Sequence, residues 1–151
     1  MTDDLDGAVL VARAHRPADD WRAAIHEACA PLLDAGAITE TYPARCVALV
    51  EEQGPYIVLA PGIALAHARP EDGVRKLAVA AVTLHDPVEF AHPDNDPVDV
   101  VFAFGSPDAD QHVDLLSSLA GHLLTGLADR LRAADDDATA QRLLEEVRNA
   151  P

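Results

Sequence analysis

Two histidines and one arginine are the residues of this sequence whose type and position best fit chemistry. His67 lies beyond a short apolar segment and a Pro-Gly turn, within GIALAHARP (residues 62–70). Loops beyond strand ends commonly carry the functional side chains of α/β proteins. Ala66 and Ala68 are small and leave the imidazole room to meet a partner, and Arg69 is close enough to contact an anion. His67 is therefore the first candidate nucleophile. The alternative is a loop histidine bonded to backbone.

His112 is the second candidate, because it falls in the first turn of a helix that Ser106 or Asp108 would cap. The free N–H groups and the dipole of a helix N-terminus favour anions and disfavour a protonated imidazole. We expect His112 to be neutral and to donate a hydrogen bond to an oxygen of a bound anion. A surface histidine without a role is the alternative.

The remaining candidates for chemistry carry weaker signals. Asp94, Asp96 and Asp99 begin like a calcium loop, but the central Gly and the distal Glu of such a loop are missing. We therefore predict a turn in which carboxylates accept backbone N–H bonds. Five further histidines have no partner at ligand spacing and are expected to be structural or exposed: His15, His26, His85, His92 and His122.

Common catalytic motifs are absent from the sequence. It contains no phosphate-binding G-x-x-x-x-G-K-[ST], no G-x-G-x-x-G, no G-x-S-x-G and no H-E-x-x-H. Cys29 and Cys46 form no C-x-x-C pair and lie in apolar surroundings, so we expect two reduced core thiols.

The hydrophobic pattern predicts the elements that must position these residues. Short apolar runs between turn signals predict strands at 8–12, 56–60, 63–65, 77–84 and 98–104. Apolar residues at three-to-four spacing predict helices at about 18–35 (with a kink at Pro31), 43–53, 113–124, 127–133 and 138–147. Segment 87–97 holds three prolines and predicts a loop, because proline cannot donate to a strand ladder.

This mixture of strands and helices predicts an α/β layered domain. We expect residues 1–151 to form one domain, with the acidic residues 1–7 disordered. The order of the strands does not follow from the pattern.

Composition limits the classes of partner. The net charge is -15, which repels nucleic acids and anionic lipids and would attract a basic partner. Acidic runs such as 135–137 are expected to be solvated or to cap helices. We see no signal peptide and no apolar run long enough for a membrane helix, so we expect a cytoplasmic protein.

A longer stretch of the sequence carries a family resemblance. GPYIVLAPGIALAHARPEDGV (residues 54–74) resembles the phosphorylation-site segment of phosphotransferase-system IIA domains of the fructose–mannitol–ascorbate type. PVEF (87–90) and HPDNDPVD (92–99) resemble the ascorbate branch, and HVDLLSSLA (112–120) resembles the family's second-histidine helix. The similarity runs from about Trp21 to Val147.

The resemblance implies a fold and a chemistry. The fold is an α/β sandwich, a mixed sheet flanked by helices. His67 corresponds to the phosphorylated histidine and His112 to the second active-site histidine. The phosphoryl group would arrive from the phosphocarrier HPr and leave for a IIB component during uptake of an ascorbate-like sugar. The family's IIA domain itself binds no metal and no nucleotide cofactor.

Two departures from the family pattern keep alternatives open. Ala66 replaces the usual Pro before the active histidine, which leaves the loop less constrained. Val50-Glu51-Glu52 stands where the mannitol and fructose branches carry an Arg-Glu pair, and Arg69 is the candidate substitute. The alternatives are a IIA-like regulator whose phosphorylation state controls a partner, and an unrelated histidine-dependent small hydrolase.

Overall fold

A mixed five-stranded sheet forms the centre of the molecule in a computed structural model, which describes residues 8–108, 117, 121 and 126–146. Its strands are β1 (Val9–Arg16), β2 (Val58–Ala60), β3 (Ile63–Ala66), β4 (Ala78–Val88) and β5 (Val98–Gly105), in the order β1-β4-β5-β3-β2. β1 is parallel to β4 and β3 is parallel to β5, whereas β4–β5 and β2–β3 are antiparallel. The predicted α/β class is confirmed.

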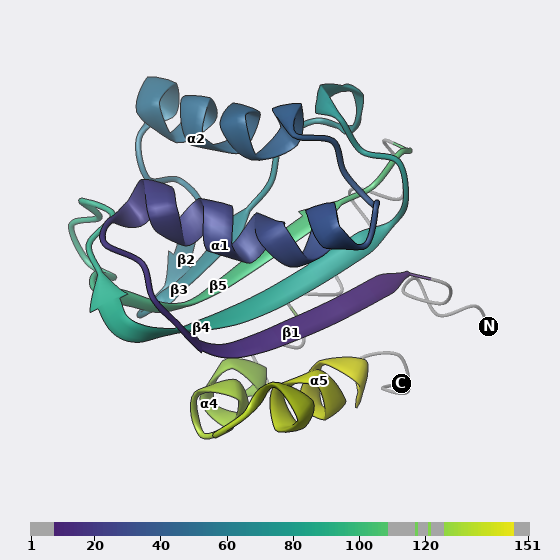
Figure 1. Ribbon diagram of the computed structural model, residues 1–151. Coiled ribbons are helices and arrows are strands. Elements are labelled where there is room, and N and C mark those ends of the chain that lie inside the picture. Colours follow the sequence, from purple (N-terminus) through teal and green to yellow (C-terminus); the bar gives the residue numbers. More distant parts are fainter. Residues whose placement is uncertain (1–7, 109–116, 118–120, 122–125, 147–151) are drawn as a thin grey trace.

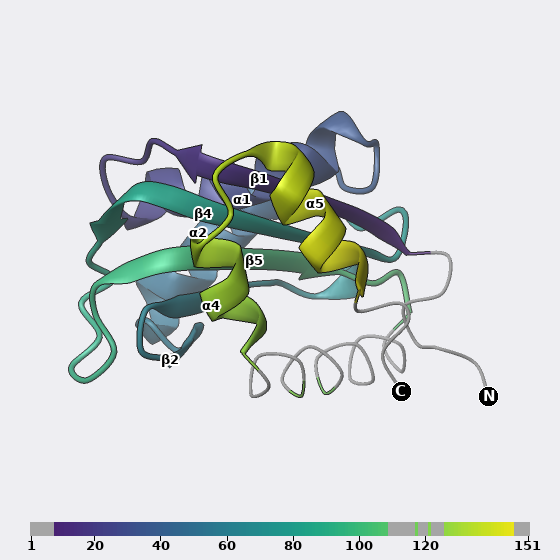
Figure 2. The ribbon, with the colours of Figure 1, turned by 90° about the horizontal axis from the view of Figure 1, so that it is seen from below.

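Helices cover both faces of this sheet, as Figure 1 and Figure 2 show. α1 (Trp21–Asp34) and α2 (Thr41–Gln53) lie on one face, and α4 (Leu127–Arg132) and α5 (Asp137–Glu145) on the other. Asp20 caps α1 by accepting the Ala23 N–H, and Asp136 caps α5 by accepting the Thr139 N–H. The expectation that the acidic run 135–137 serves capping is therefore confirmed at Asp136.

The two faces build two separate cores. Strand side chains alternate between faces, so Val101 and Ala103 pack under α1 and α2 whereas Val100 and Phe102 pack under α4 and α5. β4 is buried from Ala78 to Leu84, as expected for an interior strand with both faces covered. Cys29 and Cys46 are buried free thiols in the first core, as predicted.

The prediction of a loop from residue 87 onward was wrong at its start. β4 continues to Val88, which pairs with Val98, and so includes Pro87. The register shifts between Thr83 and Val88. Proline is tolerated at such an irregularity because its missing N–H interrupts no regular ladder bond there. β1 is also longer than predicted and runs on to Arg16.

The parallel pair β3–β5 determines where chemistry can occur. Ala66 pairs with Ala103, and both strands end within two residues of that point. Carboxyl ends of neighbouring parallel strands meet at one edge of a sheet, where the following loops gather functional groups. His67 is the first residue beyond β3. Within the described part of the chain, no helix is long and apolar enough to cross a membrane.

Candidate functional site

The backbone carbonyl of Leu65, two residues earlier, holds the His67 side chain at the carboxyl end of β3. Its Nδ1 lies 3.0 Å from the carbonyl oxygen of Leu65. A carbonyl oxygen can only accept, so Nδ1 carries the proton in this contact and Nε2 carries the lone pair. The geometry therefore selects the neutral tautomer in which Nε2 is the nucleophilic nitrogen.

Two aromatic rings fix the plane of the imidazole. Phe104 stacks on it, with ring centroids 5.2 Å apart and planes inclined by 20°. Tyr56 meets it edge-on, at 5.7 Å and 83°. These contacts limit the rotation of the side chain around its bond to the backbone. The alternative of a loop histidine bonded to backbone matches the Leu65 contact, and the two ring contacts are additional to it.

Burial lowers the pKa of His67, and the hydrogen bond to the Leu65 carbonyl opposes that effect. Removing an imidazole from water disfavours its charged form. The lowered pKa keeps the ring neutral at physiological pH, which is the protonation state that a nucleophile needs.

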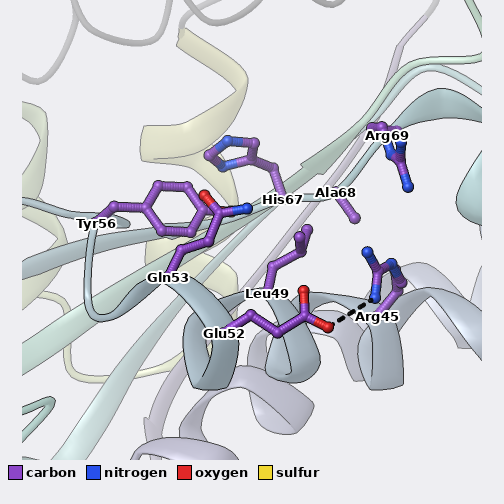
Figure 3. Close-up of a pocket in the computed structure, with 8 residues that line it drawn as sticks. All are labelled: Arg45, Leu49, Glu52, Gln53, Tyr56, His67, Ala68 and Arg69. Atoms are coloured by element: carbon purple, nitrogen blue, oxygen red, sulfur yellow. Dashed lines mark ion pairs between the residues drawn. The ribbon is translucent and has the colours of Figure 1, made fainter.

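A pocket of about 390 Å³ opens beside His67. α2 contributes Arg45, Leu49, Glu52 and Gln53, and the other lining residues are Tyr56, His67, Ala68 and Arg69. In Figure 3 the rings of His67 and Tyr56 lie at one end and the two guanidinium groups at the other. A small anion entering this pocket would meet one nucleophile and two cations.

Arg69, the predicted anion contact, lines the pocket with an exposed side chain. Its Nε lies 3.6 Å from Asp72 and 4.0 Å from Glu71, and its backbone N–H donates to the Asp72 carboxylate at 2.9 Å. That last bond begins the short 3₁₀ helix η1 (Pro70–Asp72) and fixes the chain two residues beyond His67.

Arg45 is a pocket residue that sequence reasoning missed. Its guanidinium lies 3.8 Å from Glu52 and 3.9 Å from Asp72, both longer than hydrogen bonds. Arg45 and Glu52 are seven residues apart, two turns along α2, and so share one face of the helix. Arg45 and Glu52 thus form an Arg–Glu ion pair on α2. The i,i+7 spacing of opposite charges was the available signal.

Tyr42 is the second residue that the sequence did not reveal. It is fully buried in the first turn of α2, and its hydroxyl accepts the Ala68 N–H at 2.9 Å and donates to the Phe104 carbonyl at 2.7 Å. A phenol at a core position of a helix must find polar partners, which was the signal that could have indicated it.

The other candidate residues lie away from the pocket. Asp96 accepts N–H bonds from Phe90 and His92 at 3.0 Å, and Asp99 pairs with Arg132 at 2.9 Å. The predicted backbone bonding of the aspartate turn is confirmed at Asp96. His92 accepts the N–H groups of Asp94 and Asn95, so it is structural. Among the histidines that the structure describes, His15, His26 and His85 are exposed.

Several predictions lie outside the described residues. These are His112, His122, the disorder expected at 1–7 and most of the helix expected at 113–124, in which only the helical residues 117 and 121 are described. Ser106, one of the two expected caps, is described: its hydroxyl accepts the Asp108 N–H at 3.2 Å. The role of His112 stays a prediction.

Comparison with known proteins identifies the family of this chain. Residues 10–147 match the family model of the phosphoenolpyruvate-dependent sugar phosphotransferase system, EIIA 2. The chain belongs to this family. The ascorbate-specific PTS system EIIA component of Salmonella typhimurium is 38% identical over 137 residues, which cover 89% of this chain and 87% of that protein.

Solved structures share the fold. The mannitol-specific cryptic phosphotransferase enzyme IIA CmtB of Escherichia coli is similar with a TM-score of 0.79 and 28% identity, over 93% of this chain and 92% of that one. The complex of IIAMtl and phosphorylated IIBMtl from Escherichia coli gives a TM-score of 0.72 at 22% identity, over 87% of this chain and 91% of that one. The latter similarity concerns the fold.

Proposed function

We propose that this chain is a phosphohistidine carrier, in which Nε2 of His67 accepts a phosphoryl group and passes it on. The observation that carries the proposal is the single orientation of His67, whose Nδ1 donates to the Leu65 carbonyl at the mouth of a pocket lined by two arginines. A neutral imidazole with an oriented lone pair is a competent nucleophile.

The transfer exchanges one N–P bond for another. Nε2 forms a bond to phosphorus in line with the departing nitrogen of a donor phosphohistidine, and that nitrogen keeps the electron pair of the broken bond. Both sides of the reaction hold a phosphohistidine, so the equilibrium constant is near one and the step runs in either direction. Nδ1–H stays on the Leu65 carbonyl throughout, so the phosphorylated ring is a cation. The donor ring carries a proton on its other nitrogen and departs as neutral imidazole, and no separate base is needed.

The negative charge on the three phosphoryl oxygens is stabilised by hydrogen-bond donors and cations rather than by covalent bonds to the protein. Arg45 and Arg69 line the pocket, and Gln53 adds an amide. We assign His112 to the same task, as a neutral donor at a helix N-terminus. These groups would act by position, since a loose transition state leaves little covalent chemistry to the protein.

The partners follow from this chemistry and from the relatives. A phosphohistidine protein of the HPr type is the donor and a IIB component of a sugar transporter is the acceptor. The similarity to ascorbate-specific EIIA components makes an ascorbate-like sugar the proposed substrate of the whole system. Such an exchange with HPr takes place in the cytoplasm.

A two-step relay tests the proposal. The chain is labelled with radioactive phosphate through phosphoenolpyruvate, Enzyme I and HPr, separated from HPr, and mixed with its IIB component. We expect label to leave the chain and appear on IIB. Label that enters the chain but never leaves would instead indicate a regulator, and turnover of small phosphate esters without HPr would indicate a hydrolase.

A further inference from the structure

The segment that carries His67 has no regular secondary structure to hold it. Ala66 stands before the histidine, and residues 67–69 belong to neither helix nor strand. Yet Ala68 is only 3% exposed, so its N–H is shielded from water and needs a partner inside the protein.

The partner is the Tyr42 hydroxyl. It accepts the Ala68 N–H at 2.9 Å and lies 2.7 Å from the Phe104 carbonyl and 3.3 Å from the Ala68 carbonyl. A hydroxyl has one proton, so the shorter contact, to Phe104, is the bond that it donates. The hydroxyl therefore ties the backbone after His67 to the end of β5.

Both tied residues adjoin the imidazole. Ala68 follows His67 directly, and the Phe104 ring stacks on the imidazole at 5.2 Å. The Tyr42 hydroxyl oxygen thus fixes both Ala68, which follows the nucleophile in the chain, and Phe104, whose ring stacks on the imidazole. Burial raises the pKa of Tyr42, so the hydroxyl keeps its proton at any physiological pH.

We infer that Tyr42 is a positioning residue of this site: its hydroxyl constrains the backbone after β3 and holds His67 in the orientation in which Nδ1 donates to Leu65. Without the hydroxyl, the Ala68 N–H and the Phe104 carbonyl lose their common partner. The loop then relaxes, the Nδ1 contact of 3.0 Å weakens and the other imidazole tautomer becomes populated.

The test variant is Tyr42→Phe, which keeps the ring and its volume and removes only the hydroxyl. The readout is the ratio of Nδ1–H to Nε2–H imidazole for His67, from ¹⁵N NMR of the intact chain near neutral pH. One net hydrogen bond corresponds to a ratio of about ten in the parent. We expect the ratio to fall at least about threefold in Tyr42→Phe, and phosphorylation by HPr to slow by about tenfold.

Leu144→Ala is the control for lost stability. Leu144 is fully buried in the core on the opposite face of the sheet, and its truncation costs as much stability as an internal hydrogen bond or more. We expect its His67 tautomer ratio to equal that of the parent. A parent-like ratio in Tyr42→Phe, or an equal fall in both variants, would overturn the inference.

A measurement on the parent covers the case in which Tyr42→Phe does not fold. The Ala68 amide should exchange with deuterium as slowly as the β3 amides, and exchange at the rate of an open loop would contradict the role of Tyr42. The inference rests on the proposed function only for the transfer rate. A parent that takes no phosphoryl group would refute the carrier, whereas the tautomer ratio tests Tyr42 independently.

Discussion

At the scale of single residues, the account depends on the protonation of His67. Burial sets the folded-state pKa of its imidazole below the ordinary value of about 6.5. The nucleophile therefore stays neutral at pH values where an exposed histidine is already half protonated, and phosphoryl acceptance should persist there.

The same shift makes stability depend on pH. Between the lowered folded pKa and the unfolded pKa of about 6.5, the unfolded chain binds more protons than the folded chain. The His67 contribution is therefore constant above that window, and stability falls as the pH falls through it. Urea unfolding of the parent and of His67→Asn is measured at pH values above and below the window. The free energy of unfolding should fall more for the parent than for His67→Asn between these two pH values. Equal losses would contradict the buried neutral imidazole.

The charges of the pocket make a second prediction at this scale. Glu52 lies 3.8 Å from Arg45 and competes with phosphoryl oxygens for its guanidinium. Arg45→Ala should shift the equilibrium with phospho-HPr away from phosphorylated His67 by roughly three- to tenfold, and Glu52→Gln should shift it the opposite way. Quantitative labelling at equilibrium measures both. Shifts of the same sign would exclude Arg45 as a phosphoryl contact.

At the scale of elements, α4 holds the turn that leads into β3, the strand that precedes His67. Arg132 donates to Asp99 on β5 at 2.9 Å and to the Pro61 carbonyl at 3.3 Å, so it spans the turn between β2 and β3. Gly62 lies beneath it with a φ of +78°, and a Cβ there would come within 2.6 Å of the Arg132 guanidinium.

Gly62→Ala should therefore cost more than the backbone strain alone. Gly36 is the matched control, because its φ is +73° and a Cβ there would meet nothing within 4 Å. We expect Gly36→Ala to cost about 1 kcal/mol and Gly62→Ala about 2–3 kcal/mol in urea unfolding. Equal costs would mean that Arg132 simply moves aside and does not hold the turn.

The elements also show what the sequence could reveal. Apolar runs located all five strands of the sheet, and three-to-four spacing located α1, α2, α4 and α5. The pattern could not indicate that β4 passes through Pro87, because tolerance of proline depends on a register shift against β5. Strand order was equally hidden, since it is a property of long-range pairing.

Only part of the candidate site could be predicted from the sequence, because the rest depends on long-range packing. His67 and Arg69 follow from their position after a strand and from the family resemblance, whereas Arg45 and Tyr42 lie more than twenty residues earlier in the chain. Only the packing of α2 against the ends of β3 and β5 brings them to the histidine. Local periodicity contains no information about that contact.

At the scale of the whole molecule, the net charge of -15 acts on encounters with partners. An acidic protein attracts a basic partner surface over about one Debye length, roughly 10 Å at 0.1 M salt. The second-order rate of phosphoryl transfer from HPr should therefore fall severalfold between about 0.03 M and 0.3 M salt. Stopped-flow or rapid-quench rates measure it, and a rate independent of salt would contradict electrostatic steering.

That residues 1–151 form one domain stays a prediction.

The central claim is that His67 carries the phosphoryl group, and intact-mass spectrometry tests it most directly. The chain and its His67→Ala variant are incubated with phosphoenolpyruvate, Enzyme I and the cognate HPr. The account predicts one acid-labile phosphoryl adduct on the parent and none on the variant. An adduct that persists on His67→Ala, or a parent that takes none, would contradict it.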